Sequence, residues 1–341
     1  MTIAGAPLVS VIVSVYKAQK FIIKKIDDLL RQSIIDQTEI IIIDSGSPEN
    51  EKEIISLYSR LYPQIKYTRT EERETLYAAW NRAIRTAKGQ FITNSNADDL
   101  LRKDALEILS GYLLRNPGTG MVYADQILTS EPNKSVDELT DKKLIRFPDF
   151  NYVYMLERCI IGSQPMWRAD IHFDQNIWFD ESFEVSGDHE FELRVAGVYQ
   201  ITHISETLGT FYKAADKSNK ETENLARTAA EVNRITNSFT DHYLSRLSVP
   251  GMQNLLNAYI RYLRTPAILY IAAELSVRYL TPNIYKKYLF HSVEFTYWFT
   301  CKILLSYKRE KEVIKYCKKY LRYKKSEKIE LLLKGLYNEQ R

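Results

Sequence analysis

Short apolar runs alternate with amphipathic helical patterns over the first hundred residues. The first run, Val9–Val15, is dense in β-branched residues and predicts a strand buried on both faces. Residues 20–32 carry apolar side chains at helical spacing, and residues 39–43 form a second apolar, strand-like run. The elements expected next are a helix from Ser47-Pro48 to Tyr62, a strand over 65–67, a helix over 75–87, a strand over 91–93 and a helix beginning near Arg102. This βαβαβαβ order predicts an α/β fold with a Rossmann-like, mostly parallel sheet flanked by helices.

Polar residues follow the carboxyl ends of three of these strands. Tyr16, Asp44 and Asp98 each fall just past a strand's end. In parallel sheets, ligands bind beyond the carboxyl ends of the strands, so we expect a binding site at this edge. The chain has no GxGxxG after the first strand and no GxxxxGK[ST], which argues against a dinucleotide-binding Rossmann site and a P-loop enzyme.

The strongest chemical signal is the acid pair in the segment 94–99, which reads Asn-Ser-Asn-Ala-Asp-Asp. Adjacent carboxylates repel each other, and a divalent cation relieves that cost. Carboxylate oxygens are hard ligands that suit Mg²⁺ and Mn²⁺, and Mg²⁺ commonly adds substrate phosphates to one or two carboxylates. The prediction is a cation held by Asp98, with Asp99 as a second ligand, that carries a diphosphate. The alternative is that one Asp only caps the following helix.

Length and composition indicate a soluble globular protein of two domains. The 341 residues are 45% hydrophobic and 26% charged. Three cysteines without a CxxC argue against a disulfide framework and a zinc site, and favour a reducing compartment. No signal-peptide pattern and no apolar stretch of about 18 residues is present, so we expect a cytoplasmic protein without a transmembrane helix.

Charge divides the chain into a mildly acidic body and a basic tail. Residues 307–341 contain twelve Lys or Arg and five Asp or Glu, while the whole chain has a net charge of +4. From about Ser218 the pattern is helical, beginning with Glu221 to Leu247, so domains over 1–217 and 218–341 are expected. The tail is a candidate for peripheral contact with the inner face of the cell membrane, and a packed helical bundle is the alternative. No nucleic-acid partner is expected, because the body is acidic.

Five motifs, in order, resemble those of the family 2 inverting glycosyltransferases, which have the GT-A fold and use nucleotide-sugar donors. The matching segments, with the family pattern in parentheses, are Val9–Tyr16 with Lys17 (VSVIVPVYN), Asp44–Glu49 (DDGSxD), Ala79–Ile84 (ARNxGI), Asn96–Asp99 (DADD) and Gly187–Arg194 (EDYxLxxR). The resemblance covers residues 8 to 215. Each motif alone is weak, but their common order is fairly specific.

The resemblance implies a role for each matching position. The residues implied to bind the donor nucleotide are Ser14, Tyr16, Asp44, Ser45, Asn81, Asn96, Ala97 and Asp98. Asp98 and Asp99 would hold Mn²⁺ or Mg²⁺, and Asp188 would be the base that deprotonates the acceptor hydroxyl. The residues implied on the acceptor or diphosphate side are Gln164, Trp167, Arg194 and Lys213. Core packing is the alternative for Trp167, and an N-cap role is the alternative for Asp188.

Several positions depart from the family pattern. Asn96 replaces the first acid of the metal motif, and Ser45 replaces one of two acids that help to hold the base and ribose. Gly187 replaces the Glu of the ED pair. Many family members have a His in a YRxH segment after the last strand, and it is missing here, which leaves Lys213 as a diphosphate partner.

The function implied is transfer of a sugar from a nucleoside diphosphate sugar to a hydroxyl of an acceptor glycan, with inversion. By family analogy, the acceptor expected is a bacterial surface polysaccharide or a lipid-linked oligosaccharide. One rival is a sugar nucleotidyltransferase, which usually has a Gly-rich loop where this chain has 14–18 without Gly. The other is a catalytically silent scaffold subunit that binds nucleotide sugars, which the missing acid and the missing His keep open.

Overall fold

A computed structural model describes residues 5–140, 142–214 and 225–246, together with the isolated residues 314, 317, 318 and 330. The chain divides into two compact units, Met1–Ile235 and Thr236–Arg341. The domain boundary predicted at 217/218 lies in 215–224, outside the described residues. Almost all of the basic tail also lies outside them, so its contact with a membrane remains a prediction.

The described strands of the first unit form one eight-stranded sheet. They are β1 (Val9–Val15), β2 (Thr38–Asp44), β3 (Ile65–Arg69), β4 (Phe91–Asn94), β5 (Thr119–Thr129), β6 (Lys143–Ile145), β7 (Met166–Arg168) and β8 (Gln200–Tyr212). Their order is β3-β2-β1-β4-β7-β5-β6, and β8 pairs with β5. Strands β3, β2, β1 and β4 are parallel neighbours, β7 is antiparallel to β4 and β5, and β5 is parallel to β8.

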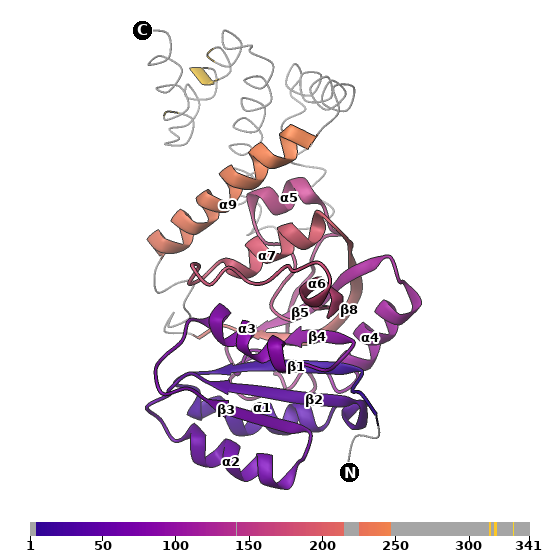
Figure 1. Ribbon diagram of the computed structural model, residues 1–341, viewed down its shortest axis with the longest axis vertical. Helices are drawn as coiled ribbons and strands as arrows, with labels where there is room; N and C mark the ends of the chain where they lie inside the picture. The colour runs from indigo at the N-terminus through magenta and orange to yellow at the C-terminus, as the bar shows by residue number, and fades with distance from the viewer. Residues whose placement is uncertain are drawn as a thin grey trace. The chain divides into compact units, whose positions relative to one another are not determined.

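Helices cover both faces of this sheet (Figure 1). The helices of the described residues are α1 (Gln19–Leu30), the 3₁₀ helix η1 (Ile35–Gln37), α2 (Glu51–Leu61), α3 (Leu76–Thr86), α4 (Ala105–Arg115), α5 (Tyr152–Glu157), α6 (Asp170–Phe173), α7 (Gly187–Ala196) and α9 (Leu225–Arg246). None of the helices in the described ranges is long and apolar enough to cross a membrane.

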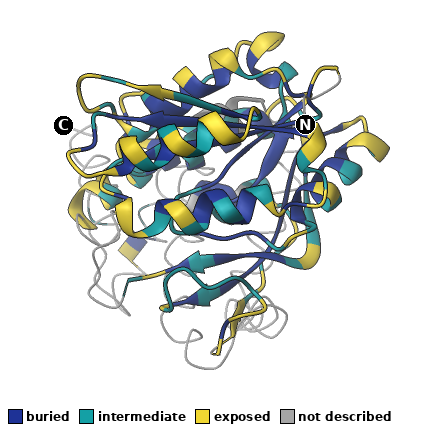
Figure 2. Ribbon diagram, turned by 90° about the horizontal axis from the view of Figure 1, so that it is seen from below, coloured by how far each residue is buried: buried dark blue, intermediate teal, exposed yellow. Residues whose placement is uncertain are grey.

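The core lies between the parallel strands and the helices, where β1 and β2 are buried along almost their whole length. Their alternating side chains face helices on both sides, which explains why these strands read as continuous apolar runs. Figure 2 shows the central strands mostly in the dark blue of buried residues, while the helices carry yellow, exposed residues on their outer faces. The α1 residues Ile22, Ile26 and Leu29 pack into this core at helical spacing.

The predicted α/β class and the order of the first elements are confirmed. Predicted helices over 20–32 and 75–87 match α1 and α3, and the helix expected from Ser47-Pro48 begins later, at Glu51. The segment 129–150, predicted as a loop or a pair of edge strands, contributes one short strand, β6. The two longest strands, β5 and β8, were not anticipated from the sequence.

Candidate active site

Three neighbouring parallel strands bring the polar features to one edge of the sheet. Val15 pairs with Asp44, and Ile12 pairs with Asn94, so the carboxyl ends of β2, β1 and β4 are adjacent. Two backbone hydrogen bonds continue this alignment past the strands: Ser45 N–H donates to the Val15 carbonyl at 3.0 Å, and Ser95 N–H donates to the Ile12 carbonyl at 2.9 Å. The loops after all three strands therefore start side by side.

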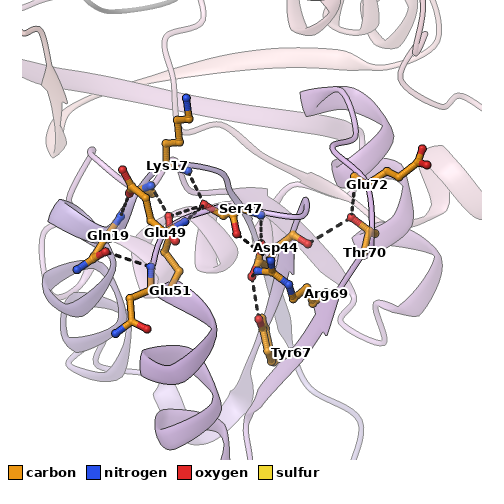
Figure 3. A network of polar contacts seen from close by, with 12 residues as sticks. Lys17, Gln19, Asp44, Ser47, Glu49, Glu51, Tyr67, Arg69, Thr70 and Glu72 are labelled. Atoms are coloured by element: carbon orange, nitrogen blue, oxygen red, sulfur yellow. Dashed lines mark hydrogen bonds and ion pairs between the residues drawn. The ribbon is translucent and has the colours of Figure 1, made fainter.

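Asp44 is fully buried at the end of β2 and accepts three donors (Figure 3). The Tyr67 hydroxyl donates to Oδ2 at 2.8 Å, and the Arg69 guanidinium forms an ion pair with the same oxygen. The Ser47 N–H donates to Oδ1 at 2.8 Å. The neighbouring Ser45 hydroxyl is also buried and has no hydrogen-bond partner among the described residues. It is therefore a polar group that a ligand could satisfy.

A second set of contacts ties the loop after β1 to the loop after β2 (Figure 3). Lys17 adopts φ 53°, and its N–H donates to Ser47 Oγ at 2.9 Å. One oxygen of the buried Glu51 accepts from the Ala18 N–H at 2.6 Å and from the Ser47 hydroxyl at 3.0 Å. These bonds fix the backbone beside Tyr16, whose half-buried ring lies under the Arg73 guanidinium, 4.3 Å from the ring centroid.

The two acids of the 94–99 segment have different surroundings. Asp99 is 2% exposed, and its Oδ1 accepts from the Tyr212 N–H at 2.7 Å. Its Oδ2 lies 3.3 Å from the Asn96 amide nitrogen. Burial, and then the charge of Asp98, raise the pKa of Asp99 to about 7. Asp98 is only half-buried, and burial raises its pKa too. Asp99 thus anchors the end of β8 to this loop, and Asp98 is the freer carboxylate.

A buried lysine lies beneath this loop. Lys25 of α1 is fully buried, donates to Ser95 Oγ at 2.8 Å and also donates to the Asp99 carbonyl. Burial lowers its pKa, and Asp28, 3.9 Å away, opposes that shift. Asp28 in turn accepts from the Leu101 N–H at 2.9 Å. Two residues one helical turn apart therefore hold both ends of the loop 95–101, which we call the acid loop.

Asp188 lies half-buried in the first turn of α7. Its Oδ1 accepts from the His189 N–H at 2.8 Å and lies 3.4 Å from the Tyr77 hydroxyl. The Tyr77 ring packs so close to Gly187 that a Cβ there would meet a ring carbon at 2.6 Å. This contact gives a physical reason for glycine at the position where the family pattern has Glu.

Three residues expected at the site have their polar groups engaged inside the protein. Asn81 donates to the Phe179 carbonyl at 2.9 Å and accepts from its N–H at 3.1 Å. Trp167 is 1% exposed, and its indole N–H donates to His172 Nε2 at 2.8 Å, so it is a core residue and not part of an acceptor surface. Arg194 forms an ion pair with Glu190 at 2.6 Å.

The other two residues expected on the acceptor or diphosphate side differ in exposure. Gln164 is buried, and its amide nitrogen has no partner within the described part of the chain. It lines a cavity of about 10 Å³ beside Gly209, which is large enough for one water molecule. Lys213 follows β8 directly and is exposed. Ser14 is half-buried in β1, and Ala97 is half-buried in the acid loop.

Motif reasoning missed several residues that shape the site. Lys25 and Asp28 lie on the otherwise apolar stripe of α1, and a charged residue on such a stripe is the signal that could have revealed them. Tyr77 and Tyr67 carry no such signal, because aromatic residues are common in cores. Their contacts with Asp188 and Asp44 depend on the fold alone.

Comparisons with known proteins agree with the fold and the motifs. The sequence profile described as Glycosyl transferase family 2 matches residues 10–168. An uncharacterized glycosyltransferase of Haemophilus influenzae is 33% identical over 179 residues, which cover 44% of this chain and 71% of the relative. Chondroitin synthase of Escherichia coli is 24% identical over 211 residues, which cover 60% of this chain and 29% of that enzyme. The chain thus spans less than a third of the synthase's length.

Solved structures support the same fold. The crystal structure of S. aureus TarS 1-349 has a TM-score of 0.51 and 16% identity, and the match covers 74% of this chain and 78% of that one. The same fragment in complex with UDP-GlcNAc also has a TM-score of 0.51. Family profile, Haemophilus relative and fold agree with the motif order read from the sequence, and the chain belongs to glycosyl transferase family 2.

Proposed function

We propose that this chain transfers a sugar from a nucleoside diphosphate sugar to a hydroxyl of an acceptor glycan and inverts the anomeric centre. The observation that carries the proposal is the shared edge of β2, β1 and β4, where Asp44 ends β2, Tyr16 follows β1 and Asp98 lies in the loop after β4. A nucleoside held at Asp44 and a diphosphate held at Asp98 would lie along this edge.

The acid loop fits a divalent cation. Asp98 and Asp99 are adjacent carboxyl groups whose pKa values are raised by burial, so a divalent cation beside them would favour their ionised forms. The described residues contain no group of three His, Cys, Asp or Glu side chains that could hold a metal. A cation at Asp98 would therefore take most of its ligands from the donor's diphosphate and from water, which is common for Mg²⁺. Bound Mn²⁺ or Mg²⁺ supplies positive charge that neutralises the departing diphosphate.

Residues of the chain would divide the remaining work. Asp44, Ser45, Ser14 and Tyr16 would hold the nucleoside, with the unpartnered Ser45 hydroxyl available for a hydrogen bond to it. Asn96, held 3.3 Å from Asp99, would present its amide to ribose or phosphate without adding charge. Ala97 would let the donor approach the loop closely.

Asp188 would take the proton of the acceptor hydroxyl on its carboxylate as the oxygen attacks the sugar. The N-terminal turn of a helix favours the ionised carboxylate that this role needs. The His189 N–H, which donates to Oδ1 at 2.8 Å, fixes the direction of this carboxylate. Gln164 and Lys213 are the remaining candidates for contact with the acceptor or the diphosphate.

The acceptor class proposed is a bacterial surface polysaccharide or a lipid-linked oligosaccharide, with the protein in the cytoplasm or at the inner face of the membrane. The chondroitin synthase relative supports a polysaccharide product. The nucleotidyltransferase alternative loses support, because the family match is to glycosyl transferases. The other alternative, a catalytically silent scaffold that binds nucleotide sugars, is distinguished from an active transferase by measuring turnover.

The test is a panel of nucleotide sugars incubated with the protein and Mn²⁺ or Mg²⁺, with release of nucleoside diphosphate measured. We expect release from one donor class, and Asp98→Asn should lose metal-dependent donor binding in calorimetry, since an amide lacks the charge that holds a hard cation. Asn96→Asp, the matched control in the same loop, should keep binding. Binding without any turnover would favour the scaffold, and unchanged metal-dependent binding in Asp98→Asn would refute the metal assignment.

A further inference from the structure

The segment 184–186, which leads into α7, is held by a carboxylate of α9. Glu231 of α9 accepts hydrogen bonds from three consecutive backbone N–H groups. Glu184 N–H donates to Oε1 at 2.9 Å, and the N–H groups of Val185 and Ser186 donate to Oε2 at 3.0 and 2.8 Å. One side chain thus satisfies three donors just before a helix begins, where backbone donors lack partners within the helix.

Two arginines of α9 contact the same segment from either side of Glu231. Arg227 forms an ion pair with Glu184. Arg234 lies 3.3 Å from Asp180 Oδ2 and 4.4 Å from the centroid of the Phe183 ring. The side chains of these ion pairs are 37–56% exposed, and such pairs contribute little to stability. Glu231 differs from them, because its partners are backbone groups that fix the course of the chain.

The held segment lies just before Asp188 in the chain. Ser186 is the N-cap residue of α7, and Asp188 follows two residues later. On the opposite side, the buried Tyr77 donates to the Val185 carbonyl at 2.8 Å. Val185 is therefore gripped at its N–H by Glu231 and at its carbonyl by Tyr77. Loss of the Glu231 bonds would free the backbone immediately before the candidate base.

We propose that Glu231 is a positioning residue that fixes the N-terminus of α7 and so aims Asp188 at the acceptor hydroxyl. The proposal rests on the proposed function, since it needs Asp188 to be the base. It assigns a role in the reaction to α9, which lies beyond the residues 10–168 matched by the family profile. The reason is geometric, because misplacement of a reacting group by about 1 Å can cost about a hundredfold in rate.

The test compares the full-length protein with Glu231→Ala, Glu231→Gln and Arg234→Ala. We expect Glu231→Ala to lower kcat at least about tenfold while KM for the donor stays within about twofold, because only the aim of the base changes. Glu231→Gln keeps an acceptor oxygen and should recover part of the rate. Arg234→Ala removes an exposed contact from the same helix and should transfer sugar at nearly the wild-type rate. Hydrogen exchange at the amides of 184–186 should accelerate in Glu231→Ala.

A double variant separates this inference from the proposed function. If Glu231 acts through Asp188, then Glu231→Ala combined with Asp188→Asn should be no slower than Asp188→Asn alone. A wild-type kcat in Glu231→Ala, fully additive losses, or a loss of donor affinity matching the loss of kcat would overturn the role of Glu231. A wild-type rate in Asp188→Asn would instead overturn the proposed base and leave the anchoring measured by hydrogen exchange as the only part that holds.

Discussion

At the scale of single residues, buried charges in the first unit find partners far away in the sequence. Glu39 in β2 accepts from the Lys88 N–H at 2.6 Å and pairs with Lys66. Lys25 and Asp28 reach the loop before α4, about 70 residues further on. A charge inside a protein is tolerated only when such partners neutralise or solvate it. These pairs therefore neutralise charge inside the core, and the contacts of Lys25 and Asp28 hold the acid loop against α1.

The Lys25 contacts predict a large difference between two neighbouring lysines of α1. Lys25→Met leaves Asp28 and the Ser95 loop without their buried cation, and we expect it to lower the free energy of unfolding by about 3–5 kcal/mol. Lys24→Met removes an exposed ion pair with Glu138 at 2.9 Å and should cost less than about 1 kcal/mol. Urea unfolding of the two variants measures both values. Equal effects would mean that the ammonium of Lys25 contributes nothing specific.

Two acids of α7 give a similar contrast in activity. Asp188→Asn should reduce the transfer rate at least about a hundredfold, within the range of general-base catalysis, while donor binding stays normal. Glu190 points instead to Arg194, with which it pairs at 2.6 Å, so Glu190→Gln should lose much less. Steady-state kinetics with a fixed donor compare the two. A wild-type rate in Asp188→Asn together with a slow Glu190→Gln would mean that the motif is read in the wrong register.

At the scale of elements, the sequence predicts the helices and strands whose pattern is contained in their own residues. Strands β1, β2, β3 and β4 and helices α1 and α3 follow from apolar periodicity and turn residues. Strand β5 was missed because its run contains Asp125 and Gln126, which look out of place in a buried strand. In the fold, Asp125 accepts from His203 Nε2 of the adjacent β8 at 2.8 Å. That pairing is tertiary and leaves no mark in the local pattern.

The site residues divide in the same way. Asp44, Asp98 and Asp188 could be located from motif order, because each lies at or just after the end of a strand or in the first turn of a helix. Trp167 could not be placed, since a tryptophan in a short strand can face a cleft or the core with the same local sequence. The aromatic cluster that buries it includes Phe179 and Phe191, which come from separate segments.

The packing of α7 on α3 predicts the effect of a single methyl group. In Gly187→Ala the new Cβ would meet the Tyr77 ring at 2.6 Å, and the buried ring cannot yield easily. We expect a cost of about 1–3 kcal/mol in unfolding free energy, together with slower transfer, because Asp188 is the next residue. Gly118→Ala is the matched control, since nothing lies within 4 Å of its added Cβ. Thermal unfolding of both variants measures the difference. A Gly187→Ala variant as stable as the wild type would contradict the close packing of Gly187 against Tyr77.

At the largest scale that the structure describes, the sheet of the first unit consists of two halves, one parallel and one mixed. The parallel half, β3-β2-β1-β4, supplies the edge at which the donor would bind. The mixed half, β7-β5-β6 with β8, connects to that edge through Asp99, which accepts from the Tyr212 N–H at the end of β8. Behind β7, the cluster around Trp167 and His172 supports α7 and its candidate base. This aromatic core therefore contributes to the stability of the first unit and also supports the helix that carries the candidate base.

That core predicts how the protein responds to acid. Burial lowers the pKa of His172 and of His189 to about 4, from an ordinary value of 6.5. His172 Nε2 accepts from the Trp167 indole, so protonation would set two donors against each other. The unfolded chain takes up these protons first, so stability is complete above about pH 6.5 and falls as the pH drops towards 4. Each histidine should cost about 3 kcal/mol by pH 4.

The measurement is urea unfolding between pH 7.5 and 4.5 for the wild type and His172→Gln. Glutamine keeps an acceptor for the indole but takes up no proton, so its unfolding free energy should depend less steeply on pH. At pH 7.5 the variant should be the less stable of the two, because the amide does not fill the space of a ring stacked against Phe191 at 5.3 Å. The two curves should therefore approach each other on acidification. Parallel curves would mean that His172 does not resist protonation, and that the acid sensitivity of the fold arises elsewhere.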